Sequence, residues 1–425
     1  MYFSEAILKK KNTIKYDTFW YTIGTISNSA TSVLLMLFVT RILGVYEAGI
    51  FSISYSIAQL MLTVGWFSTR SFQVSDINEE FKFNDYLSFK IILSIISIIG
   101  GIIYSLILGN DGYELLVTIL CCFLNLGDIF ADLCSARLQQ LDKLFIAGIS
   151  YFLRAVGYIF VFFVTLVISK SLAISILLAF LYSIFELFIF DRSIIKNLNC
   201  GLDIGTYFNF RNILRLLFAC FPLFISSFIT NFIVNIPKNS IEIAFTQDVQ
   251  AYYNIILMPS SLVNMFNMFI FVPLFTKIAR TWNVGNFSKF FKLLFSLILL
   301  LLLISSVVLI GCFILGIPFL ELLYAVDLGE YKNAFMILIC AGCLTGLNSI
   351  LSYVFTVIRK QKIVLLAYIF GLIIAQVSIN PLIKNIGLLG ASIDYLLGIS
   401  TIALFMTLSL FIVLRKKKYK LEVGK

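Results

Sequence analysis

The residues best suited to chemistry in this sequence are ionisable side chains that lie inside long apolar segments: Asp128, Asp132, Arg154 and Glu186. If those segments cross a membrane, burying these groups is costly, and such groups usually face a bundle interior or a water-filled cavity. We therefore expect substrate or ion binding to involve this set.

A polar stripe runs along one of these segments. Its members follow one another at spacings of 3, 4, 3 and 4, which places them on one helix face: Asn125, Asp128, Asp132, Ser135 and Gln139. Two interpretations are open. The stripe faces a cavity, or the span ends earlier and both acids lie among lipid headgroups.

Arg154 lies about 14 Å of helix rise into the next apolar segment, close to mid-depth. Its guanidinium could bind phosphate oxygens through a planar fork of donors, or neutralise Asp128 or Asp132 on the neighbouring helix. The two aspartates, as an isolated pair in low dielectric, would resist double ionisation. One of them should therefore hold a proton or pair with a cation, so proton or sodium coupling and a structural ion pair both remain open.

The elements that position these residues must be membrane helices. Of 425 residues, 60% are apolar and 13% are charged, and the mean hydropathy is +1.00. A soluble domain is about 45–50% apolar and about 25% charged. The composition therefore predicts an all-α integral membrane protein.

Since a helix needs about 20 mostly apolar residues to cross the hydrocarbon core, we count twelve candidate spans. They cover residues 18–40, 48–69, 86–108, 113–135, 145–168, 172–191, 214–236, 250–275, 290–314, 333–358, 363–383 and 387–414. The N-terminal sequence is not a signal peptide, because its short apolar stretch precedes the basic cluster.

Positive charge is distributed unequally between the two sides of this topology. Lys and Arg number 26 on the side of the termini and five on the other, with Arg154 inside a span. Basic residues accumulate in cytoplasmic loops, so both termini of this multi-pass protein are predicted to be cytoplasmic. The net charge of +10 then reflects orientation, not nucleic-acid binding, and the tail 415–420 is expected to meet anionic lipid headgroups.

Enzyme chemistry has little support. The chain has no His, the commonest metal ligand and base near neutral pH, and its eight Cys show no paired spacing. No connection between spans is long enough for a catalytic domain of about 50 residues. We predict a protein that is not an enzyme and needs no metal or other cofactor.

The twelve spans divide into two sets of six at a polar segment, 192–215. We predict an N-terminal bundle, residues 1–200, and a C-terminal bundle, residues 201–425. Two sets of six spans suggest a parallel repeat, which is a common way to build a transporter whose substrate site lies between the halves.

Short motifs along nearly the whole chain resemble one family. They are Thr40-Arg41-Ile42-Leu43-Gly44 with Glu47-Ala48-Gly49-Ile50-Phe51, Ile236-Pro237-Lys238 with Tyr252-Tyr253, Leu320-Glu321-Leu322-Leu323-Tyr324 with Glu330-Tyr331, and Gly387-Leu388-Leu389-Gly390-Ala391-Ser392. The family is the polysaccharide-unit flippases (Wzx-type) of the multidrug/oligosaccharidyl-lipid/polysaccharide exporter superfamily. Soon after the last of these motifs the family commonly has a small or apolar residue. This sequence has Asp394 there and so departs from the family pattern.

The resemblance implies two six-helix bundles around a central cavity that opens alternately to either side. The implied substrate is an undecaprenyl-diphosphate-linked oligosaccharide, moved from the inner to the outer leaflet of a bacterial cytoplasmic (inner) membrane for capsule, O-antigen or teichoic-type polymers. Polymerases and glycosyltransferases of the same pathway would be partners. A cation-coupled multidrug antiporter of the same superfamily is the alternative.

The substrate-binding candidates on this view are Arg154, Arg70, Arg41, Lys238, Asn231 and Ser29. Arg70, at the cytoplasmic end of the second span, is the preferred first contact for a diphosphate. Arg41 and Lys238 are expected at the external mouth, where they could instead anchor the helices. Ser29 and Asn231 could bind sugar hydroxyls or pack against neighbouring helices, as small and polar residues also do in membranes.

Overall fold

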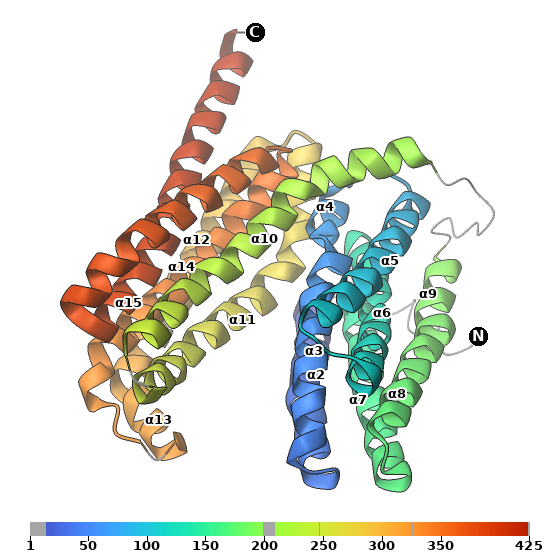
Figure 1. The fold of residues 1–425 in the computed structure, drawn as a ribbon. Coiled ribbons are helices and arrows are strands. Elements are labelled where there is room, and N and C mark those ends of the chain that lie inside the picture. The colour runs from blue at the N-terminus through green and yellow to red at the C-terminus, as the bar shows by residue number, and fades with distance from the viewer. Residues whose placement is uncertain (1–13, 199–208, 246, 325, 424–425) are drawn as a thin grey trace. The chain divides into compact units, whose positions relative to one another are not determined.

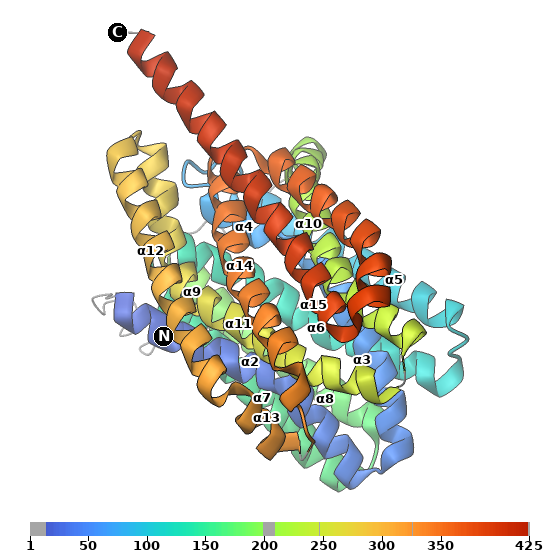
Figure 2. The same cartoon turned by 90° about the vertical axis from the view of Figure 1, so that its left-hand side faces the viewer.

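The computed structural model describes residues 14–198, 209–245, 247–324 and 326–423, and these form helices without a strand (Figures 1 and 2). An all-helical chain follows from its composition, because a helix satisfies every backbone hydrogen bond within its own segment in lipid. Ten helical segments of the described residues are long and apolar enough to cross a membrane.

The chain divides into two compact units, Met1–Cys220 and Phe221–Lys425. The predicted boundary at residues 200 and 201 falls within residues 199–208, outside the described part of the chain, and stays a prediction. The polar segment that suggested it, 192–215, ends within the first turns of the next helix, where Asn212 Nδ2 donates to Asp85 Oδ1 at 3.1 Å.

The first unit contains the six predicted N-terminal spans. Its helices are α2 (Ile14–Ile42), α3 (Val45–Trp66), α4 (Thr69–Ser75), α5 (Phe83–Ile107), α6 (Gly112–Gln140), α7 (Leu144–Ser169), α8 (Leu172–Glu186), the π-helical turn η1 (Leu187–Asp191) and α9 (Arg192–Asn197). The span that held both aspartates is a continuous helix, α6, which runs past its predicted end to Gln140.

The helix α10 (Phe210–Ala244) begins in the first unit and continues into the second unit. Its other helices are α11 (Gln247–Asn283), α12 (Phe287–Gly311), the π-helical turn η2 (Cys312–Gly316), α13 (Ile317–Tyr324), the 3-10 turn η3 (Gly329–Tyr331), α14 (Lys332–Val357) and α15 (Gln361–Val423). The eighth predicted span lies in α11, and the side chains at 261–270 within it are outside the described residues.

The last two predicted spans are joined in α15, which contains a break in helical geometry at Ile386 and Gly387. Gly387 has φ +57° and ψ −134° there. Because glycine lacks a Cβ, it reaches this conformation at little steric cost. The break lies where the sequence separates the eleventh predicted span from the twelfth.

Close backbone contact holds α2 against α7 in the first unit. A Cβ added at Gly24 would lie less than 3.0 Å from the carbonyl oxygen of Gly148, and one added at Gly148 would meet the Trp20 backbone equally closely. At the ends of these helices, the Phe145 amide donates to Asp17 Oδ1 at 2.9 Å. Small residues allow this approach, as is common between membrane helices.

Candidate functional site

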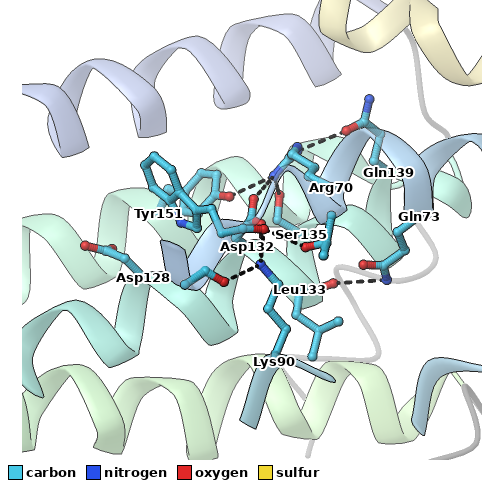
Figure 3. A network of polar contacts seen from close by, with 12 residues as sticks. Arg70, Gln73, Lys90, Asp128, Asp132, Leu133, Ser135, Gln139 and Tyr151 are labelled. Atoms are coloured by element: carbon cyan, nitrogen blue, oxygen red, sulfur yellow. Dashed lines mark hydrogen bonds and ion pairs between the residues drawn. The ribbon is translucent and has the colours of Figure 1, made fainter. Parts of the chain in front are cut away.

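A buried network of charged side chains lies within the first unit, and Arg70 is at its centre (Figure 3). The α3 helix ends at Trp66, and Phe67 and Ser68 both adopt left-handed conformations, with φ of 45° and 51°. Non-glycine residues rarely adopt this conformation. The turn redirects the chain into the short helix α4, which carries Arg70 toward α6.

Arg70 contacts residues of both α6 and α7. Its Nη1 lies 3.2 Å from Asp132 Oδ1 and donates to Ser135 Oγ at 2.8 Å and to the Tyr151 hydroxyl at 2.9 Å. Its Nη2 donates to Gln139 Oε1 at 3.0 Å. Four partners fix the guanidinium, yet the side chain keeps 20% of its surface exposed.

Lys90 is the second cation of this network, and sequence reasoning missed it. Its Nζ lies 3.2 Å from Asp132 Oδ2 and donates to the carbonyl oxygens of Gly65 and Trp66 at 3.2 and 3.0 Å. These carbonyls end α3, where a cation is favoured. The count of basic residues by side includes Lys90 with the loops, although its position inside the predicted third span, 86–108, is a usable signal of a buried cation.

Arg154 forms a second ion pair. Its Nη2 lies 2.9 Å from Asp128 Oδ1, its side chain is fully buried, and its Cζ lies 5.2 Å from the centre of the Tyr151 ring. Burial leaves Arg154 no exposed surface for a ligand in this structure, so substrate contact stays a prediction. Of its two predicted acidic partners, it pairs with Asp128, while Asp132 pairs with Arg70 and Lys90.

The polar stripe on α6 therefore points into helix contacts. Asn125 Nδ2 donates to the Ala58 carbonyl of α3 at 2.8 Å, and the stripe's other members contact Arg70 or Arg154. Asp128 is partly buried, and the rest are buried. Neighbouring helices supply the cations and the carbonyl that the stripe binds, so its acids do not lie among headgroups. That the stripe faces a cavity stays a prediction.

Two acids complete the charged set. Glu186 ends α8 and Asp191 ends the π-helical turn η1, and both are buried, at 6% and 1% exposure. Both interact electrostatically with Arg154. Asp191 was not singled out from the sequence, since it lies at the predicted end of a span and resembles a headgroup-level acid.

The remaining first-unit candidates lie away from this set. Tyr21 on α2 packs against Arg70, whereas Arg41, twenty residues further along the helix, is about 30 Å of helix rise away. Arg41 is exposed, which agrees with a place at the helix end. Ser29 is also exposed, and its hydroxyl donates to the Thr25 carbonyl of its own helix at 2.9 Å.

Lys238 and Asn231 belong to the second unit, in α10. Asn231 is exposed and Lys238 half-buried. The acid that departed from the family pattern, Asp394 on α15, is fully buried and hydrogen-bonded through Oδ1 to Ser378. These residues cannot be grouped with the first-unit network, and their substrate roles stay predictions.

Metal binding has no support in the part of the chain that the structure describes, where no group of three or more acids or cysteines could hold an ion. Among these same residues, no disulfide joins the cysteines. The chemistry available to the network is therefore charge pairing, hydrogen bonding to anions and proton transfer among carboxyls.

The solved structures of similar fold include MATE transporters. A crystal structure of the Vibrio cholerae MATE transporter VcmN in the bent form matches with a TM-score of 0.76 and 11% identity, covering 98% of this chain and 99% of that one. A mutant of the same transporter matches at 0.75 with 11% identity over 97% and 98%. A MATE structure in the bent conformation matches at 0.71 with 16% identity over 95% and 96%. At these identities the likeness establishes the fold alone.

Sequence comparison identifies the family. No curated protein matches significantly. Residues 14–279, however, match the family described as "Polysaccharide biosynthesis protein", and this range spans all of the first unit's described helices together with α10 and most of α11. The chain thus has the fold of the MATE transporters and belongs to the polysaccharide biosynthesis protein family.

Proposed function

We propose that this protein is a flippase that moves a polyprenyl-diphosphate-linked oligosaccharide from the inner to the outer leaflet of a bacterial cytoplasmic membrane. The family match over residues 14–279 carries this proposal. A MATE-type fold in a polysaccharide biosynthesis family fits a step that translocates a building block, rather than one that forms glycosidic bonds.

The chain offers little room for any other role in that pathway. Its described residues are helices joined by short connections, and ten segments can cross the membrane. A glycosyltransferase or polymerase would need catalytic groups in a sizeable domain outside the membrane. The protein acts as a transporter and not as an enzyme.

Arg70 is the residue best placed to meet a diphosphate. Its guanidinium is fixed by Ser135, Gln139 and Tyr151 and remains partly exposed. Guanidinium binds phosphate oxygens through paired hydrogen bonds. An incoming diphosphate would replace the weaker neutral partners and leave the Asp132 contact in place.

Reconstitution into liposomes tests the proposal. A fluorescent polyprenyl-diphosphate oligosaccharide would be placed in the inner leaflet, and its appearance outside would be detected with an impermeant glycosidase. We expect transport by the wild-type protein and a loss of at least tenfold in Arg70→Ala. Arg211→Ala, which removes an exposed arginine at the start of α10, is the matched control.

The same vesicles distinguish the alternative function. A cation-coupled drug antiporter would move ethidium against its gradient when a proton or sodium gradient is imposed, and would leave the oligosaccharide inside. Drug transport without oligosaccharide transport would overturn the flippase proposal.

A further inference from the structure

The helix α12 packs against the second unit with one face and leaves the opposite face exposed. Its buried residues recur every three or four positions: Phe290, Leu294, Leu297, Leu301 and Ser305. On the opposite face lies an apolar stripe of large side chains that are each more than half exposed, at Phe295, Leu299, Leu302 and Leu303. Because α12 belongs to a segment long enough to cross a membrane, we expect this stripe to face lipid acyl chains.

An exposed lysine, Lys292, marks the polar end of the apolar stripe. It comes three residues before Phe295 and seven before Leu299, so the three side chains share one helix face. Leu302 is ten residues beyond Lys292, which corresponds to about 15 Å of helix rise. One leaflet of the hydrocarbon core has about this depth. The stripe therefore extends through one leaflet and ends at a positive charge.

Two further lysines lie at a similar depth. Lys289 is one turn before Lys292 on α12, and Lys277 lies near the end of α11; both are exposed. The Asn286 amide donates to the Thr281 carbonyl at 3.0 Å, which closes the turn between the helices and brings Lys277 level with the first turn of α12. Among the residues that the structure describes, no acid forms an ion pair with any of these three lysines.

The turn that carries these lysines is held by aromatic packing and by a helix cap. The ring of Trp282 lies 5.2 Å from that of Phe287 and 5.0 Å from that of Phe290, between centroids. The Asn286 side chain accepts from the Lys289 amide at 3.1 Å. Tryptophan is enriched at the level of lipid headgroups. Its presence beside the lysines indicates that the turn lies at the membrane interface.

The general excess of basic residues on one side of the membrane does not explain this turn. Residues 277–292 contain four basic residues and no acid. The connection 76–85, on the same predicted side, contains four acids and one lysine. Positive charge is therefore concentrated where the lipid-facing stripe of α12 ends.

We infer that the exposed face of α12 and the turn before it bind an anionic phospholipid, with its phosphate at the three lysines and an acyl chain along the apolar stripe. Clustered basic residues at a membrane surface attract anionic headgroups. A soluble phosphate would meet the same lysines but would leave the stripe uncovered. A phospholipid satisfies both parts of the surface, because it joins a negative charge to a chain of leaflet depth.

Native mass spectrometry of the purified full-length protein tests the site. We expect the wild-type protein to retain phosphatidylglycerol in preference to phosphatidylcholine. A lysine near the surface contributes about 1 kcal/mol, or about fivefold, to binding of anionic lipid. The variant Lys289→Gln/Lys292→Gln should therefore lower the preference by more than about tenfold. The matched control is Lys170→Gln/Lys384→Gln, which removes two exposed lysines elsewhere and should keep the preference.

Tryptophan fluorescence locates the bound lipid. The chain has three tryptophans, so Trp20→Phe and Trp66→Phe together leave Trp282 as the reporter beside the lysines. In liposomes, phosphatidylglycerol with brominated acyl chains should quench Trp282 more strongly than brominated phosphatidylcholine does. Adding the Lys289→Gln and Lys292→Gln changes should make the two lipids quench equally. Thermal unfolding confirms that each variant is folded, and mass spectrometry alone decides if the tryptophan variant is not.

The possible results separate the lipid from other occupants. A preference for phosphatidylglycerol that the folded lysine variant loses and the control keeps supports the site. Equal binding of the two lipids by the wild-type protein, or an unchanged preference in the lysine variant, overturns it. A preference that inorganic phosphate abolishes at matched ionic strength overturns it in favour of a soluble anion. Oligosaccharide flipping is measured separately, so failure of the flippase proposal would leave this result standing.

Discussion

At the scale of single residues, the first unit pairs its buried charges in an ordered way. Arg70 and Lys90 share Asp132, while Arg154 pairs with Asp128 and also meets Glu186 and Asp191. Removing one partner of a buried pair leaves an uncompensated charge, which costs about 3–5 kcal/mol. These charged residues have unequal numbers of partners. The loss of stability should therefore differ from one substitution to the next.

Arg154→Gln should therefore destabilise the protein more than Asp128→Asn does. Without the guanidinium, Asp128, Glu186 and Asp191 lose the cation that acts on all three, and we expect a loss of about 3–5 kcal/mol. Without Asp128, the guanidinium still faces two acids, so the loss should be smaller. Thermal unfolding in detergent measures both.

Combining the two changes provides the decisive comparison. If the ion pair is structural, the double variant should be more stable than Arg154→Gln alone, because one uncompensated carboxylate is gone. Arg41→Gln, on an exposed side chain, is the control and should change little. Strictly additive losses in the double variant would contradict the pairing.

Lys90→Met should destabilise the protein through helix α3 as well as through charge. The change removes the Lys90 donor from the Gly65 and Trp66 carbonyls, although Trp66 still accepts from Thr69 Oγ1, and we expect a cost of about 1–3 kcal/mol. Asp132 still pairs with Arg70, so it loses one of its two cationic partners. The exposed Lys196→Met variant controls for removal of a positive charge. Equal melting temperatures in the two variants would argue against this role of Lys90.

At the scale of elements, small residues and irregular turns determine which helices meet. Gly24 and Gly148 let α2 and α7 approach through their backbones. Tyr151, which accepts a hydrogen bond from Arg70 of α4, lies on α7 together with Arg154. The contact between α2 and α7 therefore helps to position both residues. Helix packing therefore sets the geometry of the charged network.

Gly24→Ala and Gly148→Ala should each destabilise the first unit. The new Cβ would lie less than 3.0 Å from the facing backbone, so the helices must separate, at about 1–3 kcal/mol. Gly49→Ala on α3 is the matched control, because nothing lies within 4 Å of its added Cβ. Alanine also favours a helix by about 1 kcal/mol over glycine, so the control should be neutral or stabilising. Thermal unfolding of the three variants measures this, and similar melting temperatures would contradict the packing argument.

At the scale of the whole molecule, the distribution of basic residues is the main guide to orientation. The 26 to five ratio of Lys and Arg predicts cytoplasmic termini, and moving one span boundary would not reverse it. Lys90 departs from this count, because the structure buries it inside α5.

Cysteine labelling of intact cells checks the orientation. In a background without the native cysteines, a cysteine near Lys360 or Asp203 should be shielded from an impermeant thiol reagent. A cysteine near Asp111 or Asp327 should be labelled. Membrane permeabilisation should expose the shielded sites and serves as the control. Labelling near Lys360 in intact cells would reverse the proposed topology.

The sequence by itself determined the class of structure and the approximate helix limits. In lipid a backbone must satisfy its own hydrogen bonds, so a long apolar segment has almost no alternative to a helix. The predicted span 145–168 and the observed α7, Leu144–Ser169, differ by one residue at each end. The same reasoning singled out Arg154, Asp128 and Glu186, because a charge inside such a segment is visible without a structure.

Only the tertiary structure decided which charges meet. The pairing of Asp132 with Arg70 and Lys90, and of Asp128 with Arg154, depends on how α4, α5 and α7 pack around α6. Nothing in the spacing along one helix specifies the cation on its neighbour. The π-helical turn is a similar case, since a single widened turn changes the direction in which Asp191 points. The local sequence determines where each helix begins and ends. The energy of burying a charge depends on which side chains the neighbouring helices place beside it.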